Sequence, residues 1–124
     1  MSRIIGVVGS RRRNTKEDFD ACDKAISDNL RRGEKRGDRD QLVSGGCHLG
    51  ADRFAEIIAK RDGLSITIHY ADWEGTGRGA GFVRNGLIAR DCDILIALPA
   101  PDRTGGTEDT IRKAERLGKP VILV

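Results

Sequence analysis

The chain has 124 residues, of which 33% are charged and 38% hydrophobic, and its formal net charge is +3. A chain of this length is expected to fold as a single domain, 1–124, whose core needs no disulfide or metal. The mild charge fits an anionic ligand, but without a basic stripe it argues against a nucleic-acid partner. The charged run 31–40 mixes both signs and is predicted to be a solvated helix end.

The cysteines indicate a reducing environment. Cys22, Cys47 and Cys92 are widely spaced and contain no CxxC pair, which favours a cytoplasmic location over a disulfide framework. His48 follows Cys47 directly, and adjacent side chains rarely face one metal, so we expect no metal site and no bound cofactor. The first apolar run is too short for a signal peptide, and no stretch approaches the roughly 18 apolar residues of a membrane helix.

Five short apolar runs appear along the chain, at 3–8, 41–44, 65–70, 93–99 and 120–124. Most are rich in Val and Ile and nearly continuous, a pattern typical of strands that are covered on both faces.

Helical patterns fill the intervals between these runs. Thr15 with Asp18 resembles a capping box. The apolar helical faces that follow are Phe19, Cys22, Ile26 and Leu30; Ala51, Phe54, Ala55 and Ile58; Ala80, Val83 and Leu87; and Thr107, Ile111, Ala114 and Leu117. Gly118 and Pro120 form the stop signal of the last helix. The alternation predicts an α/β fold: a Rossmann-like, doubly wound, parallel five-stranded sheet with helices on both faces.

Glycines concentrate in the segments that follow the first four strands, 9–15, 45–52, 71–85 and 99–109. All four segments would lie at the carboxyl edge of the sheet, where open α/β sheets bind ligands. Glycine lets the backbone approach a ligand closely, and the first turn of a helix offers free N–H groups to phosphate. Paired glycines with an acid in the next turn, in 45–52 and 104–109, fit this pattern best.

Known nucleotide and hydrolase motifs are mostly missing. There is no P-loop and no G-x-S-x-G turn. The stretch GTGRGA at 75–80 matches the dinucleotide pattern G-x-G-x-x-A, but it follows the third strand rather than the first, and no acid ends the next strand. Neither histidine accompanies a nucleophile, which argues against triad chemistry.

Several polar residues in these segments are candidates for ligand contact. Arg11 could hold a phosphate or carboxylate in its guanidinium fork. Asp52 either complements the dipole of its helix or binds ribose hydroxyls and performs acid–base work. Trp73 either stacks on a base or packs in the core. The predicted ligand-binding residues are Gly9, Ser10, Arg11, Gly45, Gly46, Gly50, Asp52, Trp73, Arg84, Asn85, Gly105, Gly106 and Thr107.

In chain order, GSR at 9–11, VSGGCHLGAD at 43–52, ADWEGTGRGAGFVRN at 71–85 and GGTEDT at 105–110 resemble a branch of the SLOG superfamily. This is the branch described as YspA, related to the YpsA proteins and carrying the domain of unknown function 2493. The resemblance covers nearly the whole chain and implies a nucleotide or nucleotide-derived ligand, such as an ADP-ribose derivative.

The same superfamily contains the LOG enzymes, called lysine-decarboxylase-like, which cleave the N-glycosidic bond of nucleoside monophosphates. Their PGG-x-GT-x-x-E motif has a reduced counterpart in Gly105, Gly106 and Thr107, with Asp109 in place of the acid. The alternative function is therefore a phosphoribohydrolase in which Arg84 holds the phosphate and Asp109 acts on the ribose or on water. By analogy with LOG proteins we also expect a homo-oligomer. DNA-binding members of the superfamily leave nucleic acid as a weaker third hypothesis.

Overall fold

A computed structural model describes residues 3–30 and 40–124. The charged run predicted as a solvated helix end lies almost entirely outside these residues. In chain order the elements are β1 (Ile4–Gly9), α1 (Lys16–Asn29), β2 (Gln41–Gly45), α2 (Ala51–Asp62), β3 (Ile66–His69), the short 3-10 helix η1 (Gly77–Gly79), α3 (Ala80–Asp91), β4 (Ile94–Leu98), α4 (Gly106–Arg116) and β5 (Val121–Leu123).

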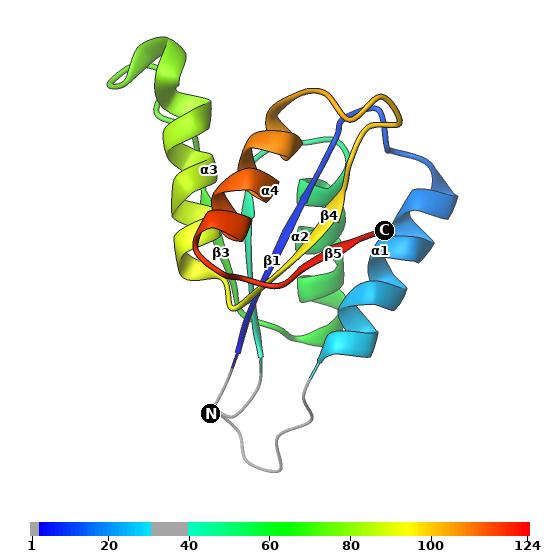
Figure 1. Cartoon of the computed structure of the whole chain (residues 1–124). Helices are drawn as coiled ribbons and strands as arrows, with labels where there is room; N and C mark the ends of the chain where they lie inside the picture. Colours follow the sequence, from blue (N-terminus) through cyan, green and yellow to red (C-terminus); the bar gives the residue numbers. More distant parts are fainter. Residues whose placement is uncertain (1–2, 31–39) are drawn as a thin grey trace.

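The strands form one parallel sheet in the order β3-β2-β1-β4-β5, which confirms the predicted fold class (Figure 1). β1 lies in the middle and pairs with β2 on one side and with β4 on the other. The chain leaves β1 toward β2 and leaves β4 toward β5, in opposite directions. The gap between the ends of β1 and β4 is therefore the switch point at which sheets of this kind bind ligands.

The core has two layers, one on each face of the sheet. α1 and α2 pack together on one face, and α3 and α4 pack together on the other (Figure 1). Alternation along the strands divides the buried side chains between the layers: Ile5 and Val7 join the α1–α2 layer, and Val8 joins the α3–α4 layer. Burial on both faces explains why the strand sequences are nearly continuous apolar runs.

The predicted capping box of α1 is confirmed. The Thr15 hydroxyl accepts the Asp18 N–H, and the Asp18 carboxylate accepts the Thr15 N–H. Two N–H groups at the start of the helix are thereby satisfied. Arg13 donates to the same carboxylate and to the main-chain carbonyl of Val124, so the loop after β1 is attached to the neighbourhood of β5.

The predicted apolar faces of α3 and α4 contain two errors. Val83 is 54% exposed, and the buried positions of α3 are instead Ala80, Asn85, Ile88 and Ala89. Leu117 is also exposed, because α4 ends at Arg116 and Leu117 is its C-cap. α3 buries a polar residue, Asn85, in its inner face, and a search for apolar periodicity therefore assigns the face to the wrong positions.

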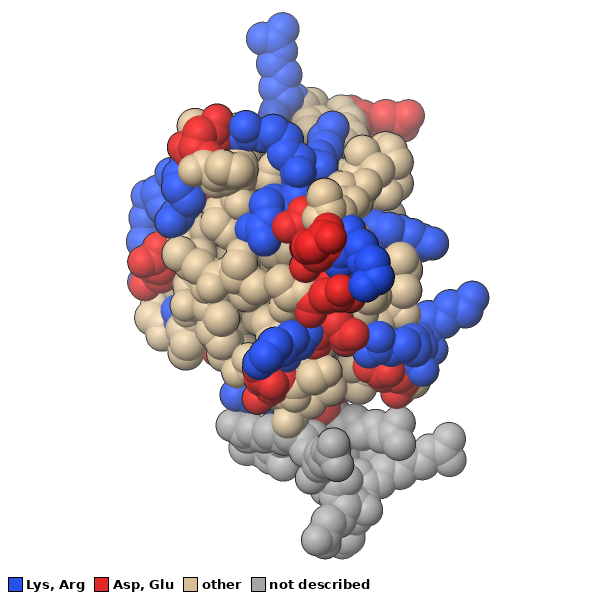
Figure 2. All heavy atoms as spheres, turned by 90° about the vertical axis from the view of Figure 1, so that its right-hand side faces the viewer, with Lys and Arg blue, Asp and Glu red and all other residues tan. Residues whose placement is uncertain are grey.

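The surface carries both signs of charge. Figure 2, which views the molecule from its α1 side, shows Lys and Arg interspersed with Asp and Glu rather than gathered in a basic stripe. Ion pairs such as Lys16–Asp20, Lys24–Asp28 and Arg61–Asp23 account for part of this pattern. In the ranges 3–30 and 40–124, no helix combines the length and the apolar character that a membrane crossing requires.

Candidate functional site

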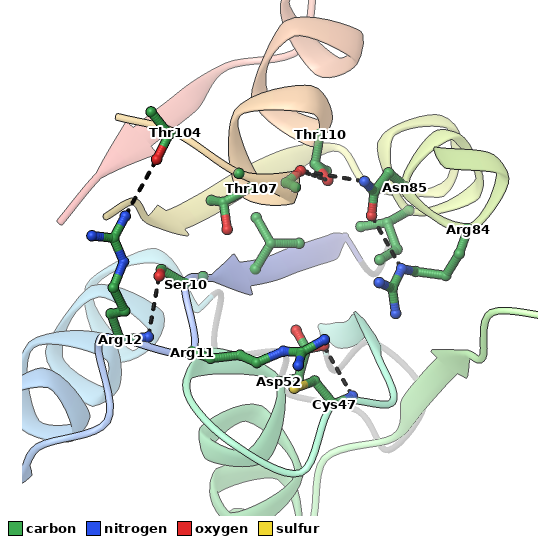
Figure 3. Close-up of a pocket in the computed structure, with 15 residues that line it drawn as sticks. Ser10, Arg11, Arg12, Cys47, Asp52, Arg84, Asn85, Thr104, Thr107 and Thr110 are labelled. Atoms are coloured by element: carbon green, nitrogen blue, oxygen red, sulfur yellow. Dashed lines mark hydrogen bonds between the residues drawn. The ribbon is translucent and has the colours of Figure 1, made fainter. Parts of the chain in front are cut away.

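A cavity of about 360 Å³ opens at the switch point (Figure 3). Its walls come from the end of β1 and the loop that follows, the β2–α2 segment, the inner face of α3, and the start of α4. The lining residues are Val8, Gly9, Ser10, Arg11, Arg12, Cys47, Asp52, Arg84, Asn85, Ile88, Thr104, Gly105, Gly106, Thr107 and Thr110. Polar and glycine positions dominate this list, in contrast to the apolar layers below.

The start of α4 forms one wall of the cavity. Its N-cap, Gly105, has a φ of 103°, a conformation that favours glycine, and no side chain caps the helix. The N–H groups of the first turn therefore have no side-chain acceptor among the described residues. Gly106 and Thr107 follow on the cavity wall. Because a helix start carries partial positive charge and free N–H groups, this wall suits an anion.

The acid next to this wall points elsewhere. Glu108 forms an ion pair with Arg103, whose guanidinium binds both carboxylate oxygens and lowers the pKa of Glu108. Arg103 itself has a φ of 54°, which is uncommon for a residue other than glycine. The pair neutralises a negative charge that would otherwise oppose an anion at the first turn of α4.

The glycines before α2 make room for other groups. A Cβ at Gly45 would lie 2.5 Å from Arg84 Nη1 and 2.7 Å from Asp52 Oδ2. A Cβ at Gly46 would overlap the ring of Tyr70. Gly50 has a φ of 74° and lies against the Ser10 carbonyl. These three glycines are absent from the cavity lining, but Gly45 and Gly50 lie against residues that do line it.

Asp52 lies at the base of the cavity and is only 8% exposed. Its Oδ2 accepts the Cys47 N–H at 3.2 Å, and its Oδ1 lies 3.1 Å from the Ser44 hydroxyl. Burial raises the pKa of this carboxyl, while the hydrogen bonds from Cys47 and Ser44 and the charge of Arg84 partly oppose the rise. Among the described residues, Asp52 forms no ion pair.

Arg84 and Asn85 reach the cavity from the first half of α3. The Nε of Arg84 donates to Asn85 Oδ1 at 3.1 Å. The Nδ2 of Asn85 donates in turn to the Gly106 carbonyl at 3.3 Å and to Asp109 Oδ2 at 3.2 Å. Asn85 thus links the guanidinium of Arg84 to the start of α4 and satisfies its own buried amide.

Asp109 does not line the cavity. Its carboxylate accepts Lys113 Nζ at 2.7 Å as well as Asn85. The helical turn places Thr110, the next residue, on the cavity wall, whereas Asp109 faces α3. In this arrangement Asp109 supports Asn85 and is neutralised by Lys113.

Two further arginines line the mouth of the cavity. Arg12 forms an ion pair with Asp102 at 2.5 Å and reaches the Thr104 hydroxyl at 3.3 Å, which connects the loop after β1 to the loop after β4. The hydrogen bond from Arg12 lowers the pKa of Asp102 to about 2. Arg11, by contrast, makes no side-chain hydrogen bond or ion pair with any residue that the structure describes.

The cavity gathers nine of the predicted ligand-binding residues in its lining: Gly9, Ser10, Arg11, Asp52, Arg84, Asn85, Gly105, Gly106 and Thr107. Gly45, Gly46, Gly50 and Trp73 lie outside the lining, and so does Asp109. Trp73 is 60% exposed and packs near Gly81. Sequence reasoning missed Arg12, Cys47, Thr104 and Thr110; Thr110 lies three residues after Thr107, and this helical spacing could have identified it.

Over residues 3–30 and 40–124, no group of three or more His, Cys, Asp or Glu side chains is arranged to hold a metal ion. His69 binds Asp91 at 2.6 Å, and neither residue lines the cavity.

The architecture and the position of the cavity define a Rossmann-like α/β protein with a pocket at its switch point. A solved structure with this fold is the molybdenum cofactor carrier protein of Chlamydomonas reinhardtii, at a TM-score of 0.66 and 22% identity, over 99% of this chain and 76% of that one. At this identity the likeness shows the fold alone.

Sequence comparison adds a family. No family model matches the chain. The Gene 61 protein of Mycobacterium phage D29 is 37% identical over 87 residues, which are 65% of this chain and 68% of the phage protein. The chain therefore belongs to the same family as this phage protein.

Proposed function

We propose that this protein binds a phosphate-bearing nucleotide or nucleotide-derived ligand, such as an ADP-ribose derivative, in the switch-point cavity. The observation that carries the proposal is the start of α4, where Gly105, Gly106 and Thr107 line the cavity and no side chain caps the helix. A phosphate placed there would accept hydrogen bonds from main-chain N–H groups and would be attracted by the positive end of the helix dipole. The Thr107 hydroxyl, which has no partner among the described residues, would add a further donor.

The size and lining of the cavity fit this ligand class. A volume of about 360 Å³ falls at the small end of the range for ligand pockets, and the arginines on its walls supply positive charge. The SLOG resemblance, in the YspA and YpsA branch, points to the same ligand class. The structural neighbour is described as a molybdenum cofactor carrier protein, which is in keeping with the binding of a small ligand in this fold.

Binding is favoured over N-glycosidic cleavage by the surroundings of Asp109. This carboxylate is held by Asn85 and Lys113 and does not line the cavity. It would have to leave both partners to reach a ribose or a water molecule. Asp52, the acid that does line the cavity, is buried and already bonded to Cys47 and Ser44.

The test is calorimetric titration with AMP, ADP, ADP-ribose and adenosine, followed by chromatography of each mixture for released base. We expect the phosphorylated compounds to bind more tightly than adenosine and to remain intact. Thr107→Val, which keeps the shape and removes the hydroxyl, should weaken AMP binding by about tenfold. The matched control is Thr67→Val, on the exposed side of edge strand β3, which should leave affinity unchanged.

Equal binding of AMP and adenosine would exclude a phosphate site at α4. Release of base that is lost in Asp109→Asn would instead establish the hydrolase alternative. The homo-oligomer expected from the resemblance remains a prediction, which sedimentation at several protein concentrations would check.

A further inference from the structure

Two of the arginines that line the cavity, Arg11 and Arg84, form no ion pair with a described residue. Arg84 donates a hydrogen bond to Asn85 through its Nε, and its Nη atoms make no hydrogen bond to a described residue. The side chain of Arg11 makes no hydrogen bond and no ion pair within the described part of the chain. In Figure 3 the two side chains extend from opposite sides toward the space around Asp52.

The acid between these arginines is already engaged. Asp52 accepts the Cys47 N–H and lies against the Ser44 hydroxyl, and no ion pair joins it to Arg84 or Arg11 among the described residues. Gly45 adds a third element, because the space that a Cβ would fill there holds Arg84 Nη1. The backbone is thus shaped to keep the Arg84 guanidinium at the cavity surface.

We propose that Arg11 and Arg84 form a second anion-binding subsite, so that the ligand carries anionic groups at two separated positions. One group would lie at the start of α4 and the other between the two guanidinium groups. This inference rests on the proposed function and narrows the ligand from nucleotides in general to those with a second, distant anionic group. Two guanidinium forks hold a phosphate or a carboxylate through charge-assisted hydrogen bonds.

Arg12 is excluded from this subsite by its contacts. Its guanidinium donates to Asp102 and to Thr104, which lie in the loop between β4 and α4. Arg11 and Arg84 are therefore the lining arginines that form no ion pair with a described residue.

The experiment compares AMP with adenosine 3′,5′-bisphosphate by calorimetry in magnesium-free buffer. We expect the bisphosphate to bind the unaltered protein about tenfold more tightly or better. In Arg11→Met this advantage should fall to near one, because bisphosphate affinity should fall by more than AMP affinity, and Arg11→Lys should restore part of the advantage. Arg11 has no described side-chain partner, so its replacement should leave the fold intact. Arg53→Met, on the exposed side of α2, is the matched control and should keep the full advantage.

The outcomes separate the two proposals. If both nucleotides bind the unaltered protein equally, the second subsite is excluded and the proposed function stands. If Arg11→Met weakens both nucleotides by the same factor, Arg11 holds the single phosphate and the two-site arrangement is wrong. If neither nucleotide binds, the proposed function is wrong, and this inference, which rests on it, is wrong as well.

Discussion

The hydroxyl oxygen of Ser44 lies 3.1 Å from Oδ1 of Asp52, beneath the cavity. The same hydroxyl lies 2.5 Å from the main-chain carbonyl oxygen of Val7. A hydroxyl has one proton, so Ser44 can donate to only one of these two oxygens at a time. When the hydroxyl donates to Asp52 it favours the ionised carboxylate, and it then partly opposes the rise in the pKa of Asp52 that burial causes.

Stability should depend on pH through this carboxyl. The pKa of Asp52 is raised above its ordinary value of 3.8, so the folded protein holds this proton at pH values where the unfolded chain has lost it. The contribution of the neutral acid is complete below pH 3.8 and is lost as pH rises through the pKa of the folded state. Asp52→Asn cannot ionise, so its free energy of unfolding relative to the unaltered protein should increase across this window. Urea denaturation from pH 4 to 8 measures the difference.

Glu74→Gln is the control for the Asp52 experiment, because Glu74 is exposed and forms no side-chain hydrogen bond or ion pair within the described ranges. A profile for Asp52→Asn that matches the profile of this control would show that burial does not raise the pKa of Asp52 in the folded protein.

Gly45→Ala should damage the site more than the fold. The added Cβ would meet Arg84 Nη1 and Asp52 Oδ2, and the flexible end of Arg84 is the group that can move. We expect a loss of about 1–3 kcal/mol in the free energy of unfolding and a fall in nucleotide affinity of about tenfold or more, as the guanidinium is displaced. Gly79→Ala meets nothing within 4 Å and serves as the control. Unchanged nucleotide affinity in Gly45→Ala would show that Arg84 does not contribute to nucleotide binding.

Asn85→Ala should both destabilise the protein and loosen Arg84. Asn85 is 6% exposed and bonds to Arg84, Gly106 and Asp109. Removing it leaves buried groups unsatisfied, at a cost of about 1–3 kcal/mol in urea denaturation. Gln41→Ala, an exposed amide on β2, should cost less than about 0.5 kcal/mol. An equal loss in the two variants would contradict the network as described.

Asp102→Asn should affect binding without affecting stability. Asp102 and Arg12 are both exposed, so breaking their ion pair should leave the free energy of unfolding nearly unchanged. The released Arg12 lines the cavity, and anion affinity at low salt should rise a few-fold. Titrations at 20 and 300 mM salt would show the gain disappearing as screening increases. A decrease in affinity would mean that Arg12 must be held by Asp102 in order to contact the ligand.

Much of the architecture was predictable because it depends on local and periodic signals. Apolar runs, glycine-rich segments and the Thr15–Asp18 capping box each determine structure within a few residues, and the parallel sheet follows from their alternation. The direction of the strands determines which edge of the sheet carries the cavity, because open α/β sheets bind ligands at the carboxyl ends of their strands. The elements whose faces were misassigned, α3 and α4, have buried polar residues or early ends that periodicity does not capture.

The roles of individual site residues were harder to predict because they depend on distant partners. Asn85 donates a hydrogen bond to Asp109 from 24 positions away, and nothing near Asp109 in the sequence indicates this contact. Arg11 and Arg12 are adjacent and chemically alike, yet only Arg12 is engaged, because Asp102 lies within reach 90 positions further on. Gly45 and Gly46 resemble a phosphate loop in sequence, but the structure uses their missing side chains to admit Arg84, Asp52 and Tyr70.

The central position of β1 also determines when the cavity forms during folding. The loop after β1 and the loop before α4, which both line the cavity, are joined by contacts such as that of Arg12 with Thr104, which are 92 positions apart. Closing so long a segment is entropically costly and tends to be slow. A ligand that touches both walls has no complete site until this closure has taken place. It should therefore leave the refolding rate almost unchanged and prolong the lifetime of the folded state.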